Sequence, residues 1–159
     1  MGGEQNWSVW GNAVDAMTVF AFTFDGMPLI YSGQEEPLKR RLAFFEKDSI
    51  TWGKYEKEVL LSKLIALKHR NKALWNGSAG GTSQRIATSN DKAIYAFLRE
   101  KEGNRVLVLL NLSATTQMPT LNCDHCTGNY QDVFTGTTQE ITNGYQVELG
   151  AWAYQVLEI

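Results

Sequence analysis

The apolar positions in the first half of the chain predict a helix followed by a short extended segment. Residues 12–24 are apolar at nearly every position, which predicts a helix that is buried on more than one side. Asp25 and Gly26 end this helix, because glycine can adopt the left-handed cap conformation, and Pro28 prevents its continuation. Residues 29–31 then form a brief apolar run bounded by turn residues, as expected for a central parallel strand that is covered on both faces.

Residues 54–74 give the clearest helical pattern in the chain. An apolar stripe with a charged opposite side indicates a helix that packs on a core through one face, with leucines and isoleucine at Leu60, Leu61, Leu64, Ile65 and Leu67. Asn76 and Gly77 close this helix. Helix, buried strand and helix in this order are typical of an α/β layer or barrel, although the sequence has no second strand of that kind.

Short alternating runs separated by turns dominate the second half of the chain. They predict strands at Gln84–Thr88, Ile94–Glu100, Arg105–Leu112, Met118–Leu121, Tyr130–Phe134, Glu140–Ile141, Tyr145–Leu149 and Trp152–Leu157. Residues 101–104 predict a hairpin connection with a positive φ at Gly103. The spacing of these runs predicts an antiparallel β-sandwich.

Glycine and polar residues cluster between Asn76 and Ser83, where the periodicity changes. We place a domain boundary near Gly80, which gives a first domain at residues 1–79 and a second at residues 80–159. The fold class predicted from both halves is therefore an α+β chain.

Length and composition narrow the class of protein. The 159 residues are 43% apolar, enough for a packed core, and the net charge is -2. The 15 Lys and Arg form no basic stripe, so we expect no nucleic-acid partner. The longest apolar stretch, at residues 13–24, is too short for a membrane span, and no signal peptide is visible. Because sequence typical of a domain interior follows Met1 directly, we expect the native N-terminus to lie upstream.

Glu35 and Glu36 could suggest the paired carboxylates of a glycoside hydrolase. Adjacent residues of an extended chain point to opposite sides, so these two carboxylates cannot readily converge on one sugar. A solvated or hydrogen-bonded loop end is the better interpretation. Glu35 alone follows the carboxyl end of a predicted strand, where α/β barrels bind ligands, which makes a supporting role at the rim of a site plausible.

The only two cysteines, Cys123 and Cys126, flank His125 with a spacing that metal sites also use. A structural zinc needs four ligands, and the other histidine, His69, lies on a predicted helix elsewhere. An incidental loop pair or a local disulfide is the preferred interpretation, while a metal site and redox chemistry remain open. We therefore predict no metal site and no cofactor for this chain.

Other catalytic patterns are missing. No Ser, His and Asp set suits nucleophilic catalysis, and the glycines form no phosphate-binding motif. Five tryptophans could stack on sugar rings, but packing in a core or interface is the commoner role: Trp7, Trp10, Trp52, Trp75 and Trp152.

Four segments resemble, in the same order, the end of an α-amylase family enzyme of glycoside hydrolase family 13. The first, Gly26-x-Pro28-x-Ile30-Tyr31-x-Gly33-x-Glu35, is similar to the family's last barrel strand. Arg41-Leu42-x-Phe44-Phe45-x-Lys47-Asp48-x-Ile50-x-Trp52 resembles the segment after that strand. The third, Leu64-Ile65-x-Leu67 with Asn71, Ala73 and Leu74, resembles the last barrel helix ahead of residues 94–99. The ending Val147-x-Leu149-x-Ala151-Trp152-x-Tyr154-x-Val156 resembles the close of the C-terminal β domain.

This resemblance implies the last helix, strand and helix of a (β/α)₈ TIM barrel, followed by an antiparallel β domain. The parent enzyme would be a retaining hydrolase of α-glucans, such as starch or maltodextrin, and would have a carboxylate nucleophile and a general acid. In the family these carboxylates follow earlier barrel strands, so no catalytic residue is assigned here, and the family's calcium sites also depend mainly on earlier segments. Tyr31 and Glu35 are the candidate rim residues.

Two functions follow from this interpretation. This chain is inactive alone and its β domain is structural, or, alternatively, the β domain is a starch-binding module that engages glucan through exposed aromatic residues. A truncated barrel also exposes apolar surface, which predicts that residues 7–50 are partly disordered or buried by self-association. The resemblance favours a secreted or cell-envelope location of the parent over a cytoplasmic one without fixing it.

Overall fold

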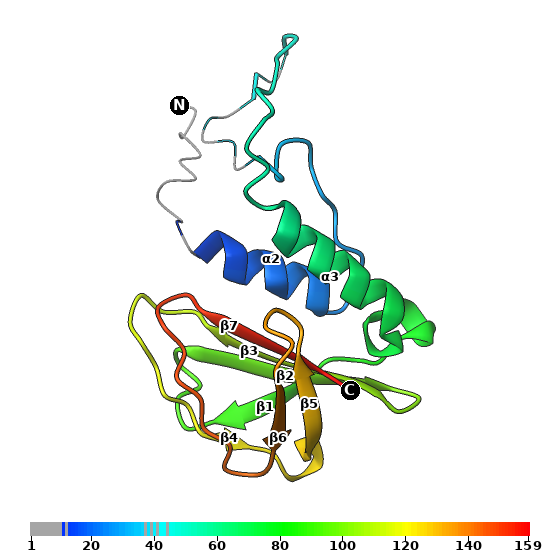
Figure 1. Cartoon of the computed structure of the whole chain (residues 1–159), viewed down its shortest axis with the longest axis vertical. Coiled ribbons are helices and arrows are strands. Elements are labelled where there is room, and N and C mark those ends of the chain that lie inside the picture. Colours follow the sequence, from blue (N-terminus) through cyan, green and yellow to red (C-terminus); the bar gives the residue numbers. More distant parts are fainter. Residues whose placement is uncertain (1–10, 12, 37, 39, 41, 44) are drawn as a thin grey trace.

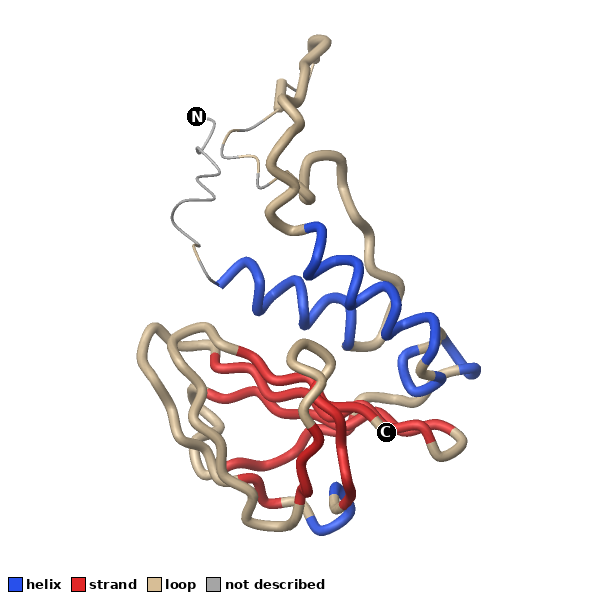
Figure 2. The backbone as a smooth tube through the Cα atoms, viewed as in Figure 1, coloured by secondary structure: helices blue, strands red, loops and turns tan. Residues whose placement is uncertain are grey.

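The computed structural model describes residues 11, 13–36, 38, 40, 42–43 and 45–159. Two helices lie across one face of a curved antiparallel sheet (Figure 1), and the loop that joins them extends away from the sheet (Figure 2). The helices are α2 (Ala13–Thr23) and α3 (Glu58–Arg70), with 3-10 turns η1 (Lys72–Leu74), η2 (Gly77–Ala79) and η3 (Asp124–Cys126). The strands are β1 (Gln84–Thr88), β2 (Ile94–Lys101), β3 (Asn104–Asn111), β4 (Leu121–Asn122), β5 (Gly128–Asp132), β6 (Thr138–Ile141) and β7 (Tyr154–Glu158).

The strands form a single sheet in the order β4-β1-β2-β3-β7-β5-β6, and each neighbouring pair is antiparallel. The predicted sandwich of two sheets is therefore wrong, because β7 pairs with both β3 and β5 and joins the strands into one half-barrel. The antiparallel pairing is confirmed. The predicted strand at Tyr145–Leu149 is reduced to isolated bridges, in which Gln146 pairs with Thr120 and Leu149 with Gln117.

The predicted hairpin between β2 and β3 is confirmed. Lys101 pairs with Asn104, so the loop has two residues, and both have positive φ: 49° at Glu102 and 84° at Gly103. This is the combination that a tight hairpin turn requires to match the twist of its strands.

The sheet buries both faces of β2 and β3, because successive side chains of a strand point to opposite sides. Ala96 and Leu98 belong to a core enclosed by the curl of the sheet, while Phe97 and Val108 belong to a second core beneath the helices. The helices contribute Val19, Phe22, Leu61, Leu64 and Leu67 to that second core. The rings of Phe20, Phe24, Tyr95 and Phe97 meet there in edge and stacked contacts.

The first half of the chain departs from the prediction at three points. Helix α3 begins at Glu58 rather than at Lys54, and α2 is buried on one side rather than on more than one, with Met17 51% exposed. Residues 29–31 form no strand, since no described neighbour supplies a hydrogen-bonding edge, and Leu29 is 79% exposed. The last barrel strand is therefore not confirmed in this chain.

Candidate functional site

The segment that contains the predicted rim residues forms a tight turn. The N–H of Tyr31 donates to Oε1 of Gln34 at 2.9 Å, and the N–H of Gln34 donates to the carbonyl of Tyr31 at 3.1 Å. Gly33 has a φ of 93°, a conformation that favours glycine. Tyr31 as a whole residue is 63% exposed.

The carboxylate of Glu36 holds the loop that precedes α3. Its two oxygens accept hydrogen bonds from the N–H groups of Gly53, Lys54 and Tyr55 at 2.8–3.1 Å. The N–H of Tyr55, followed by those of Lys54 and Gly53, lowers the pKa of Glu36. This side chain is a structural anchor, which agrees with the hydrogen-bonded loop end preferred from the sequence.

Glu35 has a different environment from its neighbour. Its backbone oxygen accepts from the N–H of Lys57 at 3.1 Å, and its Oε2 is buried with no hydrogen-bond partner among the described residues. Because Glu36 is engaged with residues 53–55, the two carboxylates do not act as a pair. The rim role of Tyr31 and Glu35 stays a prediction.

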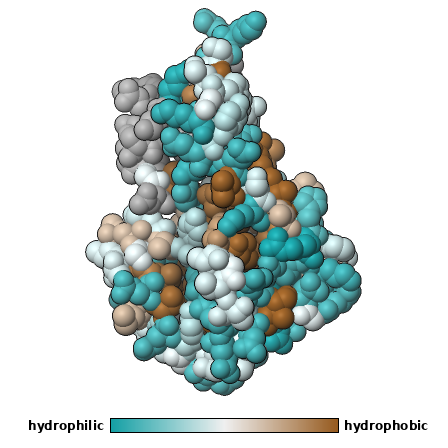
Figure 3. Space-filling view, in the orientation of Figure 1, coloured by the Kyte–Doolittle hydropathy of each residue, from teal (hydrophilic) through white to brown (hydrophobic). Residues whose placement is uncertain are grey.

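An apolar groove of about 500 Å³ opens beside this segment. It is lined by Phe22, Met27, Pro28, Ile30, Ile65, Lys68, His69, Trp75 and Asn76. Burial lowers the pKa of Lys68, whose ammonium donates to the carbonyls of Leu74 at 2.7 Å and Gly26 at 3.1 Å. Hydrophobic residues are exposed near the helices on the face that Figure 3 shows, and two of the residues that line the groove, Met27 and Ile65, are 81% and 37% exposed.

Arg99 is a buried charge that the sequence analysis did not identify. It is 2% exposed, and its guanidinium donates to the carbonyls of Gly81, Thr23, Phe24 and Trp75. The period of two along β2 places it on the helix side with Tyr95 and Phe97, which is the signal that could have found it. It ties the end of α2 to the sheet.

Cys123 and Cys126 form a local disulfide, one of the alternatives that the sequence left open. Both cysteines are buried, while His125 is exposed and its two ring nitrogens lie 3.5 Å from Sγ of Cys123. His69 lies on α3, whereas His125 lies in η3 at the end of the sheet remote from both helices (Figure 2), so the two histidines are not brought together.

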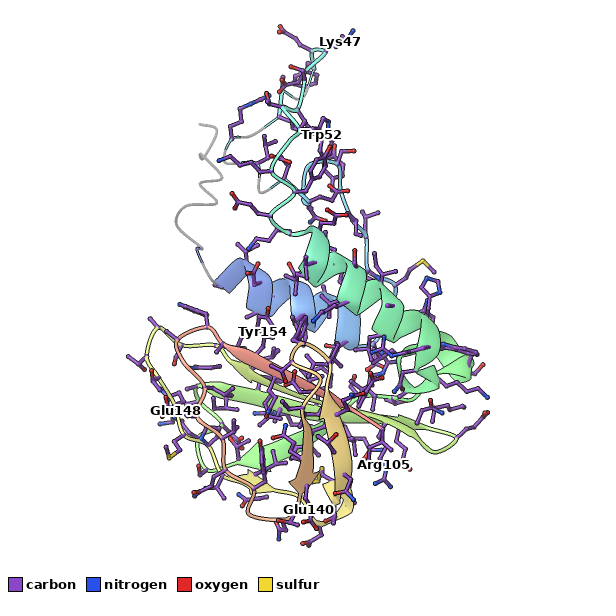
Figure 4. All side chains as sticks on the ribbon, in the orientation of Figure 1. Lys47, Trp52, Arg105, Glu140, Glu148 and Tyr154 are labelled. Carbon is purple, nitrogen blue, oxygen red and sulfur yellow. A yellow bond between two sulfur atoms is a disulfide. The ribbon has the colours of Figure 1, made fainter. Side chains whose placement is uncertain are left out.

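None of the three described tryptophans is fully buried. Trp52 is 45% and Trp75 40% exposed, whereas Trp152 is more covered; Trp7 and Trp10, like Arg41 and Phe44, lie outside the described residues. Figure 4 shows Trp52 on the extended loop that also carries Lys47. Within residues 84–159, all of which are described, every aromatic side chain is buried or half-buried.

Residues 84–156 match the family model described as the C-terminal domain of maltogenic amylase. An α-amylase of Saccharomycopsis fibuligera is 31% identical over 136 residues, which are 82% of this chain and 27% of that protein. This chain therefore spans about a quarter of the length of that relative. No helix in the described part of the chain is long and apolar enough to cross a membrane.

Solved structures share the fold. The maltogenic α-amylase AmyB of Thermotoga neapolitana aligns with a TM-score of 0.77 and 19% identity, over 94% of this chain and 36% of that one. A complex of AmyP E221Q with maltotriose aligns with a TM-score of 0.69 and 16% identity, over 91% of this chain and 34% of that one. With the family model and the α-amylase relative, this places the chain in the α-amylase family, glycoside hydrolase family 13, in the region of its C-terminal β domain.

Proposed function

We propose that this chain is the C-terminal region of a retaining α-amylase-type hydrolase that acts on α-glucans, in which residues 80–159 form a structural β domain. Residues 1–79 would then be the last helix, strand and helix of its catalytic barrel. The observation that carries the proposal is the one-sided burial of α2 and α3. Their inner side packs on the sheet, while Met17, Met27, Leu29, Val59 and Ile65 remain exposed on the rest of their surface and on the segment between them.

We expect an exposed apolar side of this extent if further strands of the barrel cover it in the parent enzyme. Retaining glycosidases need two carboxyl groups about 5 Å apart on either side of the glycosidic bond. Glu35 and Glu36 do not supply such a pair, so the chain alone is inactive in this proposal. The maltotriose bound by AmyP supports an α-glucan oligosaccharide as the substrate of the parent enzyme.

Three further parts of the proposal concern the parent and the free chain. Calcium, where the parent binds it, is held by segments outside this chain. The local disulfide supports a secreted or cell-envelope location, because disulfides persist in oxidising compartments. In the free chain, a second copy buries the exposed apolar side of the helical pair.

The test is a reducing-sugar assay on soluble starch and maltoheptaose with the purified chain. We expect no hydrolysis above a buffer control. Hydrolysis that is lost in a Glu35→Gln variant prepared in parallel would overturn the proposed inactivity, because it would assign the activity to this chain rather than to a contaminant.

A starch-binding module is the second candidate, and one observation favours it. The rings of Trp52 and Tyr55 lie nearly parallel, with centroids 6.1 Å apart, and each residue is 45% exposed. Such rings can stack on a sugar. The β domain, however, offers no exposed aromatic side chain in residues 84–159. We expect no change in tryptophan fluorescence on titration with maltoheptaose; a saturable change that Trp52→Ala removes would favour the binding module.

A further inference from the structure

Three side chains of the connection between β4 and β5 bring metal-binding atoms close together. Cys123, His125 and Cys126 place one ligand atom each within 4.8 Å of one another. Their turn, η3, lies at the end of the sheet remote from both helices (Figure 2). The site therefore belongs to the β domain alone, and it is independent of the proposed function.

One pair of these atoms, Sγ of Cys123 and a ring nitrogen of His125, already has the separation that a tetrahedral zinc requires. Zinc binds sulfur at about 2.3 Å and imidazole nitrogen at about 2.0 Å, which places a sulfur and a nitrogen ligand roughly 3.5 Å apart. Both ring nitrogens of His125 are 3.5 Å from Sγ of Cys123. By the same geometry, the two sulfur atoms would have to lie about 3.8 Å apart once the disulfide is reduced. Rotation of the two side chains can provide this separation, because their Cα atoms are 5.4 Å apart.

The loop is held in shape by contacts other than the disulfide. The N–H of Cys123 donates to Oδ1 of Asn143 at 3.0 Å, and Oγ1 of Thr127 donates to the carbonyl of Asp124 at 2.9 Å. Arg105, which reaches the carbonyl of Thr127, is paired through Nε with Glu100 at 3.0 Å. These hydrogen bonds do not involve the sulfur atoms, so we expect the loop to keep its shape on reduction, and the nearby guanidinium is already paired with a carboxylate.

We propose that residues 123–126 are a thiol site with two states, a disulfide when oxidised and a zinc site when reduced. A dithiol reductant supplies two electrons and two protons to the protein disulfide and becomes a cyclic disulfide itself. Zn²⁺ then replaces the two thiol protons and is bound by Sγ of Cys123, Sγ of Cys126 and one ring nitrogen of His125. Water fills the fourth position, as in zinc sites with three protein ligands.

Thiolate and imidazole are the ligands that favour Zn²⁺ over hard cations such as Mg²⁺ and Ca²⁺. The exposed ring of His125 lies at the solvent side of two buried sulfur atoms, so a cation can enter from that side. The state of the loop would follow its surroundings: an oxidising compartment keeps the disulfide, and a reducing one with available zinc keeps the metal.

The test measures Zn²⁺ binding to the full chain by competition with a chromophoric chelator, before and after reduction. A phosphine is the reductant, because it leaves no thiol to compete for zinc and is oxidised by taking oxygen from water. We expect one Zn²⁺ per reduced chain and none per oxidised chain. Co²⁺ in place of Zn²⁺ should give a thiolate-to-metal absorption band in the near ultraviolet.

His125→Asn should weaken Zn²⁺ binding by at least about tenfold, while His69→Asn, the matched control on α3, should leave it unchanged. Circular dichroism follows the fold throughout, and if reduction lowers the structural signal, Zn²⁺ should restore it. The proposal would be overturned if the oxidised chain bound Zn²⁺ equally well, or if the His125→Asn variant had the same affinity as the original chain. It would also be overturned if the reduced chain bound no Zn²⁺, whether or not circular dichroism shows it to be folded.

Discussion

Nη1 of Arg99 donates a hydrogen bond to the backbone oxygen of Phe24 at 2.8 Å, which joins strand β2 to the C-terminal end of helix α2. The same guanidinium reaches Gly81 and Trp75, so one buried side chain satisfies carbonyl groups from three separate segments. Since the last carbonyls of a helix lack partners within the helix and carry its partial negative charge, a cation there is favourable.

Arg99→Met should therefore destabilise the chain strongly. The methionine would fill part of the space but leave several buried carbonyls unpaired, and we expect a loss of about 3 kcal/mol in the free energy of unfolding. Urea denaturation measures it. Arg70→Met is the matched control on α3, where the arginine side chain is 47% exposed and its hydrogen bonds go to the carboxylate of Glu158, and it should cost less than about 1 kcal/mol. Equal losses in the two variants would contradict the role given to Arg99.

The hairpin between β2 and β3 gives a second prediction. Gly103 has a φ of 84°, and a Cβ there would meet no atom within 4 Å, so any cost of substitution comes from the backbone. We expect Gly103→Ala to lower the free energy of unfolding by about 1 kcal/mol, and Gly103→Asn to cost less because asparagine tolerates positive φ. Thermal unfolding of both variants measures the order. A Gly103→Ala variant as stable as the Gly103→Asn variant would contradict the expected order.

The anchor at Glu36 predicts a dependence on pH. Hydrogen bonds from residues 53–55 depress the pKa of Glu36 in the folded chain below its ordinary value of 4.5. A depressed carboxyl pKa stabilises the fold above the ordinary value, and this contribution is lost as the pH falls below it. The difference in urea midpoint between the original chain and Glu36→Gln should thus shrink from pH 7 to pH 3.

Glu56→Gln, at an exposed position on the same loop, is the control for that experiment. It removes the same charge without removing the acceptor of residues 53–55, so its midpoint should differ little from the original chain at either pH. A Glu36→Gln difference that stays constant or grows on acidification would rule out the anchor.

Local patterns predicted most elements, while features that depend on distant residues were missed. The alternation at residues 84–88 and the turn at Gly103 are encoded within a few residues, and both were predicted with the observed bounds or conformation. The pairing of β7 with both β3 and β5 joins positions far apart in the chain, so the sandwich was predicted instead of one curved sheet.

The same distinction explains the errors in the first half. The apolar run at residues 29–31 has the composition of a strand, but a strand also needs a neighbour, and the described residues provide none. Helix α3 begins later than its periodicity indicates, because Tyr55 has a φ of 49°, outside the right-handed helical region, so the helix can begin only after it. Glu35 lies in a turn, in agreement with the loop end expected from the sequence, and its role at the rim of a sugar site stays a prediction.

The uncovered side of the helical pair leads to a final prediction, on self-association. Leu29 is 79% and Ile65 37% exposed, beside a groove that is mostly apolar. We expect the chain to sediment as a dimer or larger species at tens of micromolar, since burial of such a surface is favourable. The double variant Leu29→Glu and Ile65→Glu should shift the chain to monomer without lowering its unfolding midpoint, because neither side chain is buried in the folded chain. Met118→Glu, 63% exposed on the β domain, should leave the species unchanged. A monomer in the original chain, or dissociation caused equally by Met118→Glu, would show that this surface is not what associates.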